Sequence, residues 1–301
     1  MPDGTTVDFD AIKAELRQRA DAAPRVDMTR PSGLCDAMTL RAKQFPPIRW
    51  VIPGYVPEGL SILAGKPKLG KSWLSLDWAI AVAYGGTAMN SILCGGGNVL
   101  YAALEDNQRR LQGRMSTLIP DPDVDWPADL DFATEIPRLD DGGVEFIEQW
   151  IGAVDNPRLI IVDTLAKVRG SRNRNDSAYE QDYAAVERLQ RLASERGVAI
   201  IMVTHTRKMG ADDPIDTVSG TLGLTGAADT TLVLDRGSDG QVKLYGRGRD
   251  TPEIEQAVEF GKESCRWSIL GDAGQVAKSS ERERVFGALT DAPEPMSATE
   301  V

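Results

Sequence analysis

The sequence predicts an α/β fold in which a mostly parallel, twisted sheet carries antiparallel strands at its C-terminal edge. Between residues 46 and 234, short apolar stretches alternate with segments of helical apolar spacing, the order of parallel strands joined by crossover helices. Between residues 241 and 270, shorter stretches alternate like antiparallel strands. A short helical arm is expected before this core, and the start of a helix-turn-helix after it.

Signals in the sequence bound the elements of the core, residues 46–274. An apolar strand at 60–64 ends at Gly65, and a helix at 72–84 stops at Gly85-Gly86, a typical C-terminal helix signal. A long helix is expected at 178–196, where apolar residues recur on one face. The other expected strands are 98–104, 158–162, 198–203, 229–234, 241–245, 256–260 and 264–270.

Two segments flank the core. Apolar residues within 8–23 have roughly helical spacing, and prolines and glycine then break the pattern. Residues 1–45 are therefore expected to be either an arm with a short helix, docking on a neighbouring subunit, or a partly disordered tail. In the segment 275–301, a charged helix at 275–289 is expected, and Ser297 with Glu300 fits a capping box that opens a second helix. This pattern suggests a longer natural protein, cut within a helix-turn-helix.

Composition limits the kinds of site and compartment. The chain has 301 residues, of which 42% are hydrophobic, an ordinary globular composition. It contains no apolar run of about 18 residues and no secretory signal, so we expect a cytoplasmic protein without a membrane span. Its three cysteines are scattered and it has one histidine, which argues against a disulfide framework and against a metal centre built from cysteine or histidine.

The net charge argues against a protein that coats DNA over its whole surface. The formal charge is −11 at pH 7, which repels nucleic acid at long range. A negative net charge is compatible with a local basic groove, or with a ring lumen lined by a few lysines and arginines.

The segment Gly65-Lys66-Pro67-Lys68-Leu69-Gly70-Lys71-Ser72 has the spacing of a P-loop and lies between an expected strand and an expected helix. Its glycines let the backbone wrap closely, so that amide groups and the helix N-terminus face phosphates. We expect this segment, with Trp73 directly after it, to bind ATP. Lys71 should reach the β- and γ-phosphates, and the Ser72 hydroxyl should ligate Mg²⁺. A chance match on a strand–turn–helix connection is the alternative.

Acidic residues follow two of the expected strands. Asp163 ends the apolar stretch Ile160-Ile161-Val162, where a carboxylate can hold Mg²⁺ through a water molecule. Glu105 follows the strand at 98–104, which we expect to lie next to the P-loop strand, and can position the attacking water. Asp106 is its rival. The alternatives are an aspartate that caps the next turn and a solvated acidic pair.

His205, the one histidine, follows the strand at 198–203. Ligands of open α/β sheets bind at the carboxyl ends of the strands, so a role as γ-phosphate sensor is expected for it. A lone histidine is more often structural, and that alternative stays open.

The order of these motifs resembles the RecA-like ATPases, and within them the hexameric helicases of the plasmid RepA and DnaB type. Ser219-Gly220-Thr221, Ala227-Ala228-Asp229 and Val233-Leu234-Asp235-Arg236 match the strand entry of that group, over a resemblance that covers residues 46–270. The resemblance implies a RecA-like fold. It also implies that Arg247 and Arg249 reach the ATP of the next subunit. Alternatively, they flank a hairpin turn and pair with carboxylates.

Two basic connections could touch single-stranded DNA, because in RecA-like rings the loops after the two central strands face the lumen. Solvated basic loops are the alternative. The residues concerned are Lys167, Arg169, Arg172 and Arg174 in the first loop, and Arg207 and Lys208 in the second.

The sequence as a whole predicts an ATP- and Mg²⁺-dependent motor on single-stranded DNA, a replicative helicase or helicase-like protein. It is expected to form a homo-oligomer, a ring or a filament, and the resemblance implies a hexameric ring in which each site is completed by its neighbour. Two alternatives remain: a non-translocating ATP-dependent DNA-binding mediator, and a P-loop small-molecule kinase.

Overall fold

A computed structural model describes residues 10, 13, 14, 34–169, 178–207, 211–218, 222–237, 240–279 and 282. The chain divides into two units, Met1–Pro47 and Ile48–Val301. In the first unit, helix α2 (Ala37–Ala42) occupies a stretch expected from the sequence to be a connector, and Asp36 caps it by accepting from two backbone amides at 3.0 Å. Most of the helix expected at 8–23 lies outside the described residues.

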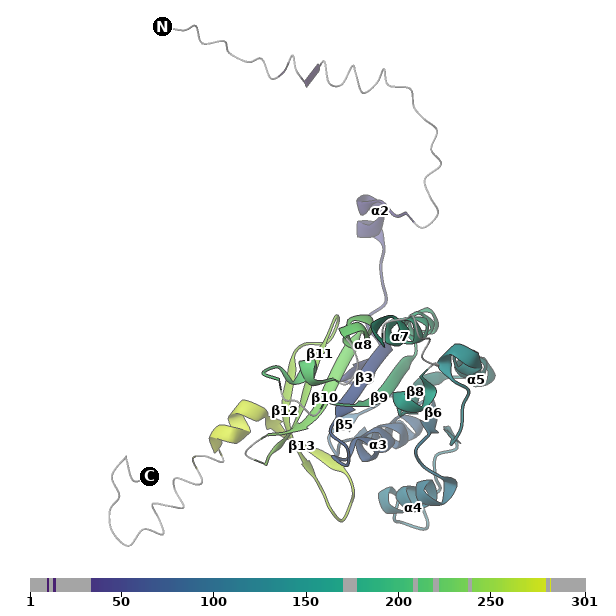
Figure 1. The fold of residues 1–301 in the computed structure, drawn as a ribbon, viewed down its shortest axis with the longest axis vertical. Helices are drawn as coiled ribbons and strands as arrows, with labels where there is room; N and C mark the ends of the chain where they lie inside the picture. The colour runs from purple at the N-terminus through teal and green to yellow at the C-terminus, as the bar shows by residue number, and fades with distance from the viewer. Residues whose placement is uncertain are drawn as a thin grey trace, which may run out of the picture. The chain divides into compact units, whose positions relative to one another are not determined.

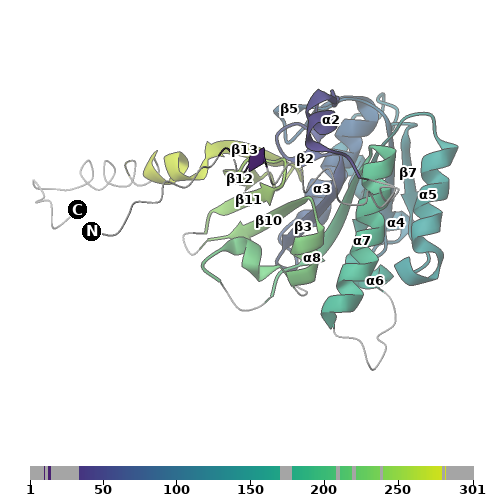
Figure 2. The same cartoon turned by 90° about the horizontal axis from the view of Figure 1, so that it is seen from above.

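The second unit contains, within its described residues, a nine-stranded sheet in the order β13-β12-β11-β10-β3-β9-β8-β6-β7. Neighbouring strands from β10 to β7 run parallel, and β11, β12 and β13 add antiparallel pairs at one edge (Figure 2). The predicted fold class is confirmed. The strands are β3 (Gly59–Gly65), β6 (Asn98–Ala103), β7 (Leu130–Ala133), β8 (Pro157–Asp163), β9 (Ala199–His205), β10 (Thr230–Arg236), β11 (Val242–Gly248), β12 (Ile254–Phe260) and β13 (Trp267–Asp272).

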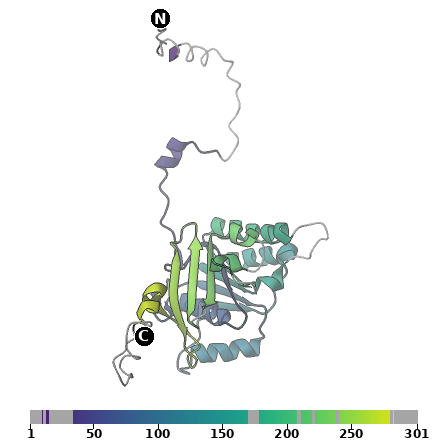
Figure 3. The same ribbon diagram turned by 60° about the vertical axis from the view of Figure 1, so that its left-hand side comes forward.

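Helices cover both faces of the sheet (Figures 1 and 3). The side chains of α3 (Lys71–Tyr84) and α4 (Gln108–Leu118) pack on one face, with Leu63 and Ile161 of the strands. Those of α5 (Val144–Ala153) and α7 (Ala178–Arg196) pack on the other, with Ile62 and Ile160. Alternate residues of a strand point to opposite faces, so burial on both faces explains why these strands are apolar throughout.

Several short elements complete the unit, and the sequence patterns do not predict them. The hairpins β1–β2 and β4–β5 supply buried residues to the α3 face, and η1, α6 and α8 supply them to the α7 face. Their bounds are β1 (Trp50–Ile52), β2 (Val56–Pro57), β4 (Thr87–Ala88), β5 (Ile92–Leu93), η1 (Leu139–Gly143), α6 (Leu165–Val168), η2 (Pro214–Thr217) and α8 (Leu222–Ala227).

The register of the parallel strands brings their carboxyl ends to one edge. Gly65 at the end of β3 pairs with His205 at the end of β9, and Asp163 at the end of β8 pairs with Ala103 of β6. One expectation is wrong: β6, which precedes Glu105, is not a neighbour of β3, because β9 and β8 lie between them. Sheet order depends on how the crossover helices pack, which a strand-by-strand pattern does not contain.

Helix α3 begins at the P-loop and ends where the sequence predicts. Gly85 follows its last residue in the left-handed conformation, with φ of 64°, and its amide reaches back to Val82 O. At the other end of the unit, residues 273–279 are helical. The rest of the helix expected at 275–289, apart from residue 282, and the capping box at Ser297 and Glu300 lie outside the described residues. No helix among the described residues is long and apolar enough to cross a membrane.

Candidate nucleotide site

The P-loop connects β3 to α3, and both of its glycines are required by close approaches. A Cβ on Gly65 would lie 2.6 Å from the carbonyl oxygen of Leu234 on β10. Gly70 has a φ of +101°, and a Cβ there would lie 3.0 Å from the indole of Trp267. These positions therefore exclude larger residues, and the loop wraps tightly around the start of α3.

Lys71 lies at the centre of this loop and is only 5% exposed. Its Nζ donates to the carbonyl oxygens of Gly65 at 2.7 Å and Lys66 at 3.0 Å, and lies 3.3 Å from Nδ1 of His205. Burial lowers the pKa of Lys71 to about 8, and the nearby carboxylates of Asp163 and Glu105 oppose that shift. The loop thus holds a desolvated cation that an anionic phosphate would stabilise.

Asp163 ends β8 and is also nearly buried, at 5% exposure. The hydroxyl of Tyr101 donates a hydrogen bond to Oδ2 at 3.1 Å, and the side chain of Ser72 also interacts with this carboxylate. Burial raises the pKa of Asp163, while these two donors lower it. Ser72 on α3 and Asp163 on β8 therefore present oxygen atoms side by side.

This pair of oxygen donors fits Mg²⁺. Among the described residues there is no group of three or more histidine, cysteine or acidic side chains that could hold a metal ion. Mg²⁺ does not require such a cage, because it is usually held by one or two protein oxygens together with substrate phosphates and water. Ser72 and Asp163 supply that number of ligands beside a phosphate-binding loop.

The two acidic residues after β6 have different surroundings. Asp106 forms ion pairs with Arg110 at 2.8 Å and Arg114 at 2.9 Å, which engage both of its carboxylate oxygens. Glu105 lines the pocket, and its Oε1 lies 3.4 Å from the hydroxyl of Thr164, the residue after Asp163. The geometry therefore presents Glu105, rather than Asp106, to the pocket.

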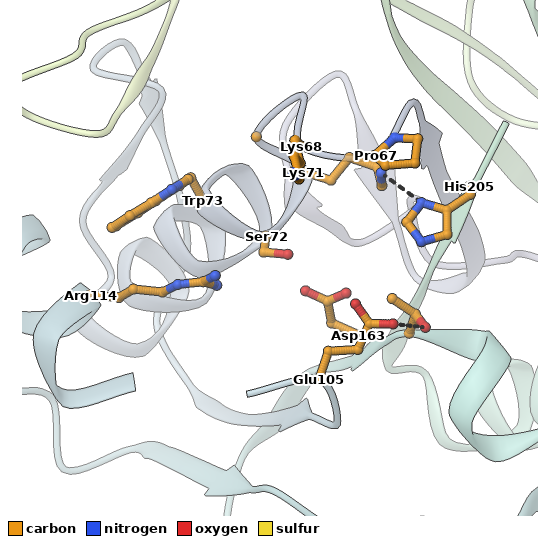
Figure 4. Close-up of a pocket in the computed structure, with 11 residues that line it drawn as sticks. Pro67, Lys68, Lys71, Ser72, Trp73, Glu105, Arg114, Asp163 and His205 are labelled. Carbon is orange, nitrogen blue, oxygen red and sulfur yellow. Dashed lines mark hydrogen bonds between the residues drawn. The ribbon is translucent and has the colours of Figure 1, made fainter. Parts of the chain in front are cut away.

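Figure 4 shows the resulting pocket, of about 480 Å³, with Lys71 and His205 facing the carboxylates of Glu105 and Asp163. This volume is within the range of small-molecule sites. Of the expected P-loop set, Gly65, Lys66 and Leu69 do not line it, and Lys66 instead pairs with Asp235 at 2.9 Å. The lining residues are Pro67, Lys68, Gly70, Lys71, Ser72, Trp73, Glu105, Arg114, Asp163, Thr164 and His205.

Arg114 and Thr164 line the pocket but are not in the set expected from the sequence. Arg114 comes from α4, and its guanidinium lies 5.2 Å from the centre of the Trp73 ring. The sequence contains a pattern that could have pointed to Arg114. Asp106, Arg110 and Arg114 follow one another at intervals of four, the spacing of ion pairs along a helix. Thr164 could have been found only from its position after Asp163.

Arg247 and Arg249 do not reach the pocket of their own chain. Thr231 of β10 pairs with Arg247 on one side and with Ile62 on the other, so Arg247 lies level with the middle of β3. Its guanidinium contacts Asp213 and Glu253, both at 2.8 Å. Arg249 donates to Gly226 O at 3.1 Å and lies 3.6 Å from Asp229. The pairing with carboxylates that was the alternative expectation for these arginines is thus present.

The basic connections follow β8 and β9 at the edge of the sheet that carries the pocket. Lys167 is exposed on α6, and Arg207 is exposed directly after β9. The backbone of Arg207 bonds to Thr217 O at 2.6 Å, which closes the base of the second loop. Arg169 is half-buried after α6. Arg172, Arg174 and Lys208 lie outside the described residues.

Comparison with known proteins gives the family. The model of the AAA domain family matches residues 29–211, which is more than half of the chain. The chain belongs to the AAA domain family. The matched part of this AAA domain includes the P-loop, Glu105, Asp163 and His205, whereas β10 to β13 follow it. No curated protein matches the chain in sequence.

Two solved structures resemble this AAA domain in fold. One is an isolated ATPase domain, with a TM-score of 0.57 at 16% identity, over 89% of this chain and 100% of that one. The other is a KaiC-like protein from the archaeon Pyrococcus horikoshii OT3, with a TM-score of 0.52 at 16% identity, over 74% of this chain and 99% of that one. With the family match, they confirm the predicted RecA-like P-loop ATPase fold.

Proposed function

We propose that this protein hydrolyses ATP to drive movement on single-stranded DNA, as a replicative helicase or a helicase-like replication protein. The observation that carries the ATPase part is the pocket. A buried P-loop lysine, two oxygen ligands suited to Mg²⁺ and a carboxylate on the opposite wall meet around one cavity of about 480 Å³. The core at 46–274 carries this activity, with 1–45 as an arm and 275–301 as a helical extension.

Nucleotide binding uses the P-loop. The backbone amides at the start of α3 face the phosphates, and Lys71 exchanges its bonds to Gly65 O and Lys66 O for phosphate oxygens. Ser72 and Asp163 hold Mg²⁺, which neutralises charge on the β- and γ-phosphate oxygens when bound. The Trp73–Arg114 pair forms the wall beside them.

Hydrolysis depends on Glu105. Its carboxylate orients the attacking water and accepts a proton from it, a contribution of about 10²- to 10⁴-fold in rate. Thr164 bonds to this carboxylate and limits its rotation. His205, adjacent to Lys71, lies where a side chain can sense the γ-phosphate and relay its loss to the loop after β9.

The ring assembly is supported by the position of the two arginines. Arg247 and Arg249 lie away from the pocket of their own chain and are more than half exposed, at 53% and 60% of the side chain. Side chains in this position can contribute to a neighbour's site in a head-to-tail hexameric ring. On binding, the neighbour's ATP would replace the carboxylates that hold Arg247 here.

Contact with DNA is assigned to the basic connections. The residues are Lys167, Arg169, Arg172, Arg174, Arg207 and Lys208. Lys167 and Arg169 follow β8, and Arg207 follows β9, so the described members of this set come shortly after the strand ends that hold Asp163 and His205. A change at the γ-phosphate would thus be transmitted to DNA over a short stretch of chain.

Three measurements test this function against its alternatives. Single-stranded DNA should stimulate ATP hydrolysis, a non-hydrolysable analogue should give the mass of a hexamer, and a forked duplex should be separated. DNA-stimulated hydrolysis without strand separation would favour the non-translocating mediator. Phosphoryl transfer to a metabolite, with no effect of DNA, would favour the kinase. The position of Glu105, where it can orient a water molecule for hydrolysis, argues against a kinase.

A further inference from the structure

Tyr101 on β6 has a buried hydroxyl that the proposed chemistry does not use. The residue is 1% exposed and lies within the apolar strand before Glu105. Its ring packs against Phe132, with ring centres 6.0 Å apart, which accounts for the ring but not for the hydroxyl. A buried hydroxyl without a partner destabilises the folded protein, so the contacts that satisfy this group matter.

The hydroxyl of Tyr101 contacts both residues expected to hold Mg²⁺, Asp163 through its carboxylate and Ser72 through its backbone. It is 3.1 Å from Asp163 Oδ2, 3.0 Å from Ser75 Oγ and 3.4 Å from the backbone oxygen of Ser72. An ionised carboxylate only accepts hydrogen bonds, so the single proton of Tyr101 goes to Asp163. Ser75 then serves as the donor to the tyrosine oxygen.

We infer that Tyr101 is a positioning residue for the metal-binding carboxylate of Asp163. By engaging Oδ2 it leaves Oδ1 for the cation, and by touching the first turn of α3 it sets the spacing between Ser72 and Asp163. This inference rests on the proposed function, in which these two residues hold Mg²⁺.

Groups that orient a metal ligand in this way typically contribute about 10- to 100-fold to metal affinity. A hydroxyl that only fills its place in the core would contribute to stability and not to metal affinity.

The test is Tyr101→Phe in the full chain, which removes the hydroxyl and keeps the ring. Ser75→Ala is the matched control, because it removes the other partner of the hydroxyl and leaves the bond to Asp163. Binding of a fluorescent ATP analogue is titrated with Mg²⁺ at equilibrium, and separately in EDTA. Tyr101→Phe should weaken Mg²⁺ binding about tenfold, with metal-free nucleotide affinity unchanged, while Ser75→Ala should match the parent.

Asp163→Asn separates failure of this inference from failure of the metal site. If Asp163→Asn loses Mg²⁺ affinity but Tyr101→Phe binds Mg²⁺ as tightly as the parent, the positioning role is overturned. If Asp163→Asn itself keeps parental affinity, the proposed metal site and the inference both fail. In the Asp163→Asn background, Tyr101→Phe should cause no further loss, which also tests the role if the single variant folds poorly. Thermal unfolding checks the fold of each variant.

Discussion

The indole nitrogen of Trp267 donates a hydrogen bond to the carbonyl oxygen of Gly70 over 3.1 Å, although the two residues are 197 positions apart in the chain. Trp267 begins β13, the outermost antiparallel strand, and is 1% exposed. The preceding residue, Arg266, pairs with the buried Asp77 of α3 and donates to Leu118 O of α4 at 2.7 Å. The antiparallel edge therefore supports the P-loop from outside the segment that matches the AAA domain model.

Trp267→Phe should weaken ATP binding, because it keeps the ring against Gly70 but removes the hydrogen bond at the end of the P-loop. The loss of one such bond predicts a decrease of about two- to tenfold in affinity, measured by calorimetry. Trp126→Phe, at a side chain that is 42% exposed and outside the pocket, is the control. Equal affinities of Trp267→Phe and the parent would mean that β13 contributes only to packing.

ATP affinity should decrease as pH rises past about 8. The folded pKa of Lys71 is lowered to about 8 from its usual 10.5, so the free protein loses this proton in that range. Phosphate stabilises the charged form, so binding above pH 8 requires proton uptake. Calorimetry in buffers of different ionisation enthalpy measures that uptake directly. If ATP binding near pH 8.5 takes up no protons, Lys71 is not the cation that binds the phosphates.

The lowered pKa of Lys71 also makes the free energy of unfolding depend on pH. Between about pH 8 and 10.5 the unfolded chain binds more protons at Lys71 than the folded one, so this group's contribution to the free energy of unfolding rises with pH. Lys71→Met should abolish that contribution, and it provides the control for denaturant titrations across this window.

Glu105→Gln should bind ATP with Mg²⁺ yet hydrolyse it at least about a hundredfold more slowly, because the amide cannot accept a proton from water. Single-turnover hydrolysis and equilibrium nucleotide binding are measured together. Asp106→Asn is the comparison, since it alters the pairs with Arg110 and Arg114 without removing the proposed base. Parental turnover in Glu105→Gln with an inactive Asp106→Asn would transfer the role to Asp106.

Neutralising Arg169, Arg172 and Arg174 together should weaken binding of single-stranded DNA and flatten its dependence on salt. Fewer phosphate contacts release fewer counterions, while the pocket for ATP stays intact. Anisotropy titrations at several salt concentrations, with DNA-free ATPase rates, make the measurement. The control neutralises Arg188, Arg191 and Arg196, at the other end of α7. An unchanged salt slope would reduce the loop to a solvated surface.

Arg247→Ala should leave ATP binding largely intact but reduce hydrolysis, because its proposed target is the γ-phosphate held by a neighbour. The decisive experiment measures ATP hydrolysis by a mixture of the Arg247→Ala and Lys71→Ala proteins. In the mixture, some interfaces join an intact P-loop to an intact arginine, so part of the activity should return. A mixture that co-assembles, as shown by mass, but stays inactive would argue against action between subunits.

Much of the nucleotide site was predictable because its residues are set by local chemistry. The spacing of Gly65, Gly70 and Lys71, and the position of Asp163, Glu105 and His205 just after apolar strands, place these residues at one sheet edge. A P-loop needs contiguous residues, and parallel strands bring their carboxyl ends together. Both the P-loop spacing and the position of a polar residue at the end of a strand can be read from one short segment of the chain.

Other features were decided by the tertiary structure alone. The order of strands separates β6 from β3 by two others. Arg114 lines the pocket, and Tyr101 and Trp267 contact residues that line it, from segments whose patterns indicate only helix or core. The sequence by itself determined the class of fold and most of the residues that line the pocket. The structure decided which of the two carboxylates after β6 lines the pocket and what supports the P-loop. Such contacts join residues far apart in the chain and depend on how helices and strands pack, which periodicity does not encode.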